Sequence, residues 1–88
     1  MTNVSVTTSV TEILSAAPRD EQTIVIQNQS DTTMRLAIGA ANAALLTSSL
    51  GLQVDPGASY QVSGAQASNG VSAIHGGSGT KTLHVQIV

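Results

Sequence analysis

The stretch TIVIQNQSDTTMRLAI, residues 23–38, decides the fold class. Its first five residues form the most apolar short run of the chain, which is typical of a strand in the middle of a sheet. In its last five residues Met34, Leu36 and Ile38 occupy every second position, which places them on one face of a second strand. The intervening NQSDTT is rich in turn-forming residues, so the whole stretch predicts a β-hairpin.

The two-residue period continues on both sides of this stretch. Further strands are expected over residues 4–6, 10–14, 50–54, 60–62, 71–75 and 82–87. Residues 39–49 lose the alternation and are expected to form a long loop with room for one helical turn, and Pro56 and Gly57 fit a type II turn. About seven to eight short strands without βαβ units predict an all-β fold, a small antiparallel β-sandwich or barrel. We expect a single β domain over residues 11–88, preceded by an extended N-terminal arm over residues 1–10.

A glycine-rich loop near the C-terminus, HGGSGTK at residues 75–81, raises the question of an active site. A phosphate-binding loop has Gly directly before Lys-Ser/Thr and leads into a helix, whereas here Thr80 precedes Lys81 and a strand follows. The loop also lacks the last glycine of the nucleophile motif Gly-x-Ser-x-Gly. Both active-site interpretations therefore fail.

The same loop fits a two-residue type II′ turn formed by Gly79 and Thr80. This turn predicts a hairpin in which His75 lies opposite His84. This register sorts the side chains into an apolar face and a polar face. A slip of one strand by one residue would mix the two faces, so the clean sorting supports the predicted register. The apolar face would hold Ile74, Leu83, Val85 and Ile87, and the polar face Ala73, His75, Thr82, His84 and Gln86.

Two opposed histidines could share a metal ion, but the chain contains no Cys and no neighbouring acid to complete a tetrahedral site. Solvent-facing or interface histidines are the alternative. The acidic residues Glu12, Asp20, Glu21, Asp31 and Asp55 lie at or near predicted turns, which favours solvated turn positions over paired acid/base catalysis. We therefore expect no enzymatic activity, no metal site and no cofactor.

Composition narrows the choice of partner. Only 9% of the 88 residues are charged, the net charge is −2, and Tyr60 is the one aromatic residue. Nucleic-acid binding would lack both its electrostatic and its stacking contribution. No apolar segment approaches the ~20 residues of a transmembrane helix. A thin core and a weakly charged surface instead favour association with protein, including a homo-oligomer.

Two segments are candidate protein-contact surfaces. The first is the N-terminal arm with Val4 and Val6, which could add to the edge of another sheet. The second is the long loop with Leu45, Leu46 and Leu50, which either forms an exposed contact patch or folds over one end of the core.

From about Val10 to its end the chain resembles a family of small tailed-bacteriophage virion proteins. The resemblance rests on ILSAAPRDEQTIVIQNQSDTTMRLAIG, LGLQVDPGASY and VSAIHGGSGTKTLHVQIV, taken in this order. It implies a β-sandwich-like domain without enzymatic activity, in which Arg19, Asn28 and Asp31 occupy structural turn positions. The chain departs from the family pattern in its longer HGGSG turn and in lacking an aromatic residue near Gly70.

The resemblance implies a virion location after synthesis in the cytoplasm of a bacterial host. The expected function is that of a capsid decoration (cement) protein, which binds the major capsid protein and stabilises the assembled head shell, with a trimer as the favoured oligomer. A neck, tail or fibre component of the virion is the alternative. A carbohydrate-binding module is a further alternative, disfavoured by the single aromatic residue.

Overall fold

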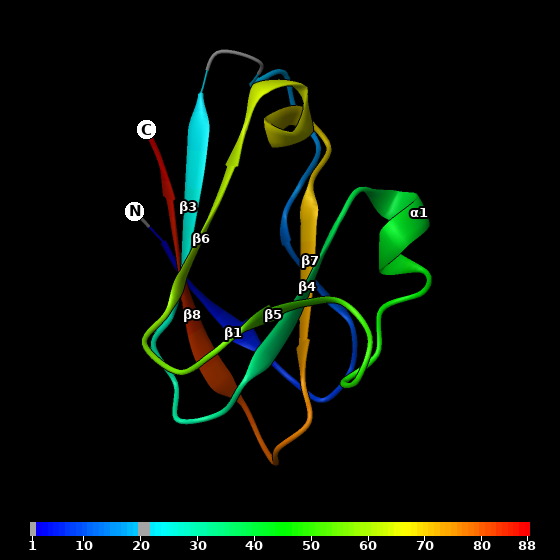
Figure 1. Cartoon of the computed structure of the whole chain (residues 1–88), viewed down its shortest axis with the longest axis vertical. Helices are drawn as coiled ribbons and strands as arrows, with labels where there is room; N and C mark the ends of the chain where they lie inside the picture. The colour runs from blue at the N-terminus through cyan, green and yellow to red at the C-terminus, as the bar shows by residue number, and fades with distance from the viewer. Residues whose placement is uncertain (1, 20–21) are drawn as a thin grey trace.

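Two four-stranded antiparallel sheets make up the computed structural model, which describes residues 2–19 and 22–88. The first sheet has the strand order β1-β8-β3-β6 and the second has the order β2-β7-β4-β5. The sheets pack face to face as two layers (Figure 1). The predicted all-β sandwich is thereby confirmed. The strands are β1 (Thr2–Val6), β2 (Thr11–Leu14), β3 (Thr23–Asn28), β4 (Met34–Ile38), β5 (Leu52–Val54), β6 (Ser59–Ser63), β7 (Val71–His75) and β8 (Lys81–Ile87), with a short helix α1 (Ala40–Ala43) and a 3-10 helix η1 (Gly64–Ser68).

The core lies between the two sheets and is built from the inward-facing side of each strand. On β3, Ile24 and Ile26 are fully buried, and this strand lies inside its sheet between β8 and β6, as its apolar sequence predicts. On β4, Met34 and Leu36 face inward as the alternation predicts. The buried cluster consists of Val6, Ile13, Ile24, Ile26, Met34, Leu36, Val54, Val62, Ala67, Val71, Ala73, Leu83 and Val85.

Both predicted hairpins are wrong. Strands β3 and β4 lie in different sheets, and so do β7 and β8. After each of these turns the chain crosses from one sheet to the other, so β8 pairs with β1 and β3, and β7 pairs with β2 and β4. His75 therefore lies opposite Met34, and His84 lies opposite Asn3 and Gln27.

Strand β7 is buried on both faces, which explains why its predicted faces are inverted. Ala73 and His75 point into the core, whereas Ile74 lies on the outer face of the second sheet. There Ile74 packs against Ala37 and Leu46, because the segment that contains α1 folds over this face (Figure 1). A strand that is covered on both sides carries no alternation from which its inward face could be read.

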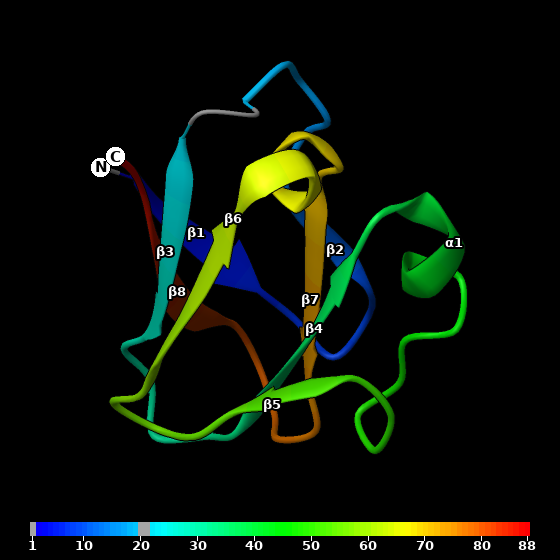
Figure 2. The ribbon, with the colours of Figure 1, turned by 45° about the horizontal axis from the view of Figure 1, so that its top comes forward.

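The N-terminal segment is part of the fold and not a free arm. Residues Thr2–Val6 pair along their whole length with β8, from Thr2 opposite Val85 to Val6 opposite Lys81. The Val6 side chain is fully buried. This register brings the two ends of the chain to the same corner of the first sheet (Figure 2).

Candidate functional site

One concave surface of the described residues is an apolar groove of about 630 Å³. It is bounded by β4 and β5 of the second sheet, by Tyr60 on β6, and by the segment of residues 42–51 that follows β4. The apolar lining residues are Leu36, Ala37, Ile38, Leu45, Leu46, Leu50, Leu52 and Tyr60, and the amides of Asn42, Gln66 and Asn69 supply its polar part. A concave apolar surface with a few amides is suited to bind an apolar segment of another molecule.

The three leucines of the long loop that were predicted to form a contact surface differ in their exposure to solvent. Leu45 and Leu50 are 65% and 58% exposed, whereas Leu46 is only 6% exposed and packs against Ile74. Leu46 packs this segment against the outer face of the second sheet, whereas Leu45 and Leu50 face solvent. Leu52 on β5 adds a third exposed leucine, 39% exposed, which the sequence analysis did not single out.

Gly51 allows this segment to approach the sheet closely. Its φ of +147° lies in a region that L side chains rarely adopt, and a Cβ atom here would lie 2.5 Å from Leu46 Cδ1 and 3.1 Å from the Leu36 carbonyl oxygen. The guanidinium of Arg35 donates a hydrogen bond of 3.3 Å to the Gly51 carbonyl oxygen. The positions of Leu50 and Leu52 therefore depend on the glycine between them.

The other predicted contact residues, Val4 and Val6, are not part of this groove. They lie on β1, at the edge of the first sheet opposite to β6. Val6 is fully buried and offers no surface, and Val4 is half-buried against the core. The structure therefore does not unite the two predicted contact surfaces.

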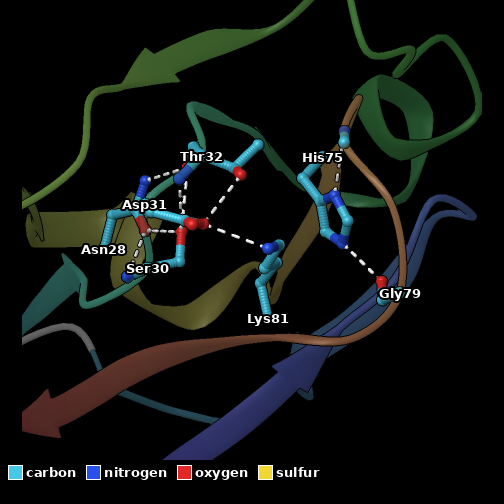
Figure 3. Close-up of polar contacts among 8 residues, drawn as sticks. Asn28, Ser30, Asp31, Thr32, His75, Gly79 and Lys81 are labelled. Carbon is cyan, nitrogen blue, oxygen red and sulfur yellow. Dashed lines mark hydrogen bonds and ion pairs between the residues drawn. The ribbon is translucent and has the colours of Figure 1, made fainter.

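A polar junction ties together the two loops that cross between the sheets (Figure 3). At the end of β3 the buried Asn28 side chain donates hydrogen bonds of 2.8 and 2.9 Å to the carbonyl oxygens of Thr32 and Val54. Its Oδ1 atom accepts hydrogen bonds from the backbone and the hydroxyl of Ser30. Asn28 thus holds the turn that follows β3 through its side chain.

His75 organises the second loop of this junction. Its side chain is 1% exposed; its Nδ1 atom accepts a hydrogen bond of 3.1 Å from the Gly77 N–H, and its Nε2 atom lies 2.8 Å from the Gly79 carbonyl oxygen. Because Nδ1 accepts, Nε2 carries the proton and donates to Gly79. Both ring nitrogens are occupied by the loop's own backbone, so His75 is a packing residue and not an available ligand.

Asp31 and Lys81 connect the two loops. The carboxylate oxygen of Asp31 lies 3.0 Å from the Lys81 ammonium, and the Thr32 hydroxyl also donates to it. The hydrogen bond from Lys81, followed by that from Thr32 and by the charge of Lys81, holds the pKa of the Asp31 carboxyl below its ordinary value. Arg19, the remaining turn residue implied by the resemblance, likewise bonds to backbone, donating to the carbonyl oxygens of Ala67 and Ser15.

The remaining candidates for chemistry lie apart from one another. His84 contacts Asn3 across β8 and β1 through Nδ1 and Oδ1, 2.8 Å apart. Glu12 accepts a hydrogen bond from Ser15, and Asp55 accepts one from Gln53. Asp20 and Glu21 lie outside the described residues. Among residues 2–19 and 22–88 there is no cluster of three His, Cys, Asp or Glu side chains that could hold a metal ion.

Sequence reasoning did not assign Tyr60, Gln66 and Asn69 to the site. Tyr60 packs against the core and at the same time lines the groove. Gln66 and Asn69 line the groove because η1 and the residue that follows it place their polar side chains at one end of it. No sequence pattern indicated this, because the contact joins segments that are distant in the chain.

Comparisons with protein-family models, with curated proteins and with solved structures find no match to this chain. In the described part of the chain no helix is long and apolar enough to cross a membrane.

Proposed function

We propose that this protein is a structural component of a bacteriophage virion, a capsid decoration protein that binds the major capsid protein of the assembled head. The proposal rests on the sequence resemblance stated above. The apolar groove is the observation that carries it structurally, because a small domain that exposes three leucines around one concavity is suited to bind another protein.

The chemistry of the groove supports a protein partner over the other classes considered. Leu45, Leu50 and Leu52 supply exposed apolar area, and the chain as a whole has only 9% charged residues, as befits a surface buried against protein. A carbohydrate would require aromatic faces for stacking, and the one aromatic ring, Tyr60, packs against the core. In the proposed complex an apolar segment of the capsid protein occupies the groove.

Copy number in purified virions tests the location. A decoration protein is expected in numbers proportional to the major capsid protein, because it binds each repeated capsomer. A neck, tail or fibre component is expected in a small fixed number set by the symmetry of the tail. Quantitative mass spectrometry distinguishes these outcomes, and absence from the virion would overturn both.

A matched pair of substitutions tests the groove. Virions that lack the protein would be incubated with the purified wild type, with the double variant L45N/L50N, or with T80N, and the bound protein quantified. Thr80 is exposed and is not among the residues that line the groove. We expect L45N/L50N to lose most of its binding and T80N to retain it. Equal binding of all three proteins would exclude the groove as the attachment surface.

A further inference from the structure

The outer edge of β1 is open. In the first sheet β1 pairs with β8 on one side, and no strand of the described residues pairs with its other side. Alternate residues of such a strand direct their backbone N–H and C=O groups away from the sheet, where they can bond to another strand. Natural sheets usually protect such edges with charges, bulges, prolines or short strands.

Two of the other three edges carry such protection. Strand β2 bears Glu12 and a register shift between Glu12 and Leu14. Strand β5 is only three residues long and is followed by Asp55 and Pro56. Strand β1, by contrast, pairs regularly over five residues, and residues 2–11 contain no charged residue and no proline.

Apolar side chains at both ends distinguish β1 from β6, the other unprotected edge. Beyond the Thr2 end, Ile87 and Val88 are exposed, and after the Val6 end Val10 is exposed. A second, smaller groove of about 340 Å³ opens beside the Thr2 end, where Ile87 lies close to the side chains of β2. The uncovered apolar area thus lies at the two ends of a strand whose long side is free to pair.

We propose that β1 pairs antiparallel with β1 of a second copy of this chain, which joins the two first sheets into one sheet of eight strands. A two-fold axis through this contact places the Thr2 end of one copy beside the Val6 end of the other. It therefore brings the end that carries Ile87 and Val88 toward the end that carries Val10. Because β1 has no charged side chains, the two copies of the strand meet without like-charge repulsion.

This contact is independent of the groove and of the proposed virion function. A contact made by one strand pair of five residues is expected to bury less area than the ~1,200 Å² of a standard interface. The fraction of dimer is therefore expected to depend on protein concentration. It is also a closed two-fold contact, so it gives a dimer in place of the trimer that the sequence favoured.

The full-length protein tests this by sedimentation equilibrium over a wide concentration range, together with amide hydrogen exchange. The wild type is expected to form dimers as concentration rises, with amides in β1 becoming slower to exchange and amides in β6 unchanged. A protein that remains monomeric, or a limiting mass of three chains, would overturn the proposal.

The substitutions S5K and S63K form a matched pair. Both serines are exposed and lie on the outer face of the same sheet, Ser5 on β1 and Ser63 on β6 at the opposite edge. S5K is expected to raise the dimer dissociation constant by about tenfold or more through like-charge repulsion across the new strand pair, and S63K to leave it unchanged. An S5K dimer as tight as that of the wild type, or equal weakening by both substitutions, would contradict pairing through β1. The exchange measurement on the wild type decides the question if S5K does not fold.

Discussion

The Asp31 carboxylate lies 3.0 Å from the Lys81 ammonium and so joins two loops 50 positions apart in the sequence. One loop carries the chain from β3 in the first sheet to β4 in the second, and the other carries it back from β7 to β8. The ion pair therefore sits where the two layers of the sandwich are tied together (Figure 3). Most of the testable consequences of the fold concern this junction.

The ion pair predicts a loss of stability in acid. The pKa of Asp31 is lower in the folded protein than its ordinary value, so the folded state binds this proton less readily than the unfolded state. The contribution of Asp31 is therefore complete at neutral pH and is lost as the pH falls below about 4. D31N should be less stable than the wild type to urea at pH 7, and the difference should shrink toward pH 2 and in high salt. A difference that persists unchanged at pH 2 would show that the pair is not its source.

Replacing Asn28 by Asp should introduce a carboxylate that destabilises the fold when ionised, whereas the ionised Asp31 stabilises it. The Nδ2 atom of Asn28 donates to two carbonyl oxygens in a buried site, and a carboxylate oxygen in its place would repel both. N28D is expected to lower the free energy of unfolding by about 2–4 kcal/mol at pH 7. The penalty should be smaller at pH 3, because a protonated carboxyl group can donate one of the two hydrogen bonds.

Asn69, which is exposed beside the groove, supplies the control. N69D should change the stability by roughly 0.5 kcal/mol or less. If N28D and N69D unfold at the same urea concentration, the buried hydrogen bonds of Asn28 contribute nothing to stability.

His75 should be important for stability and His84 should not. H75L removes the two hydrogen bonds that the buried ring makes to the Gly77 N–H and the Gly79 carbonyl oxygen of the exposed loop, at a cost of about 1–3 kcal/mol for the two together. H84L removes only an exposed contact with Asn3 and should cost about 0.5 kcal/mol or less. Urea unfolding of both variants measures the difference, and equal losses would contradict the role assigned to His75.

Gly51 should tolerate substitution less well than Gly57, although both have positive φ. A Cβ atom at Gly57 meets no atom within 4 Å, so G57A costs only the backbone strain of about 1–2 kcal/mol. G51A adds the clash with Leu46 and with the backbone of Leu36, so it should cost roughly 1–3 kcal/mol more. Thermal unfolding compares the two variants, and G57A as the more damaging one would contradict the close approach at Gly51.

The sequence predicted the strands well and their partners poorly. The alternation of Met34, Leu36 and Ile38 located β4 and its inward face, because Met34 and Leu36 are fully buried in the core. It could not decide whether a turn leads to the neighbouring strand of the same sheet or across to the other sheet. Gly79 has the positive φ expected of its predicted turn, yet β7 and β8 part there. Local turn chemistry fixes the backbone of the turn and leaves the direction of the next strand to tertiary packing.

The candidate site shows the same limit. Leu45 and Leu46 are adjacent and chemically identical, but one is exposed and the other is buried. The difference arises from the contact of Leu46 with Ile74, which lies 28 positions further along the chain. The sequence identified the leucine-rich segment as a surface of interest, and only the fold shows which of its side chains can meet a partner.

The pairing of β1 with β8 imposes an order of events on the newly made chain. Strand β1 leaves the ribosome well before its partner β8, so it waits unpaired while the ribosome adds the intervening residues, for several seconds at ~5–20 residues per second. Nascent chains on one polysome present the same uncharged strand to one another during this interval. The first sheet can thus close only once β8 has left the ribosome, and a delay in translating β8 would lengthen the exposure of β1.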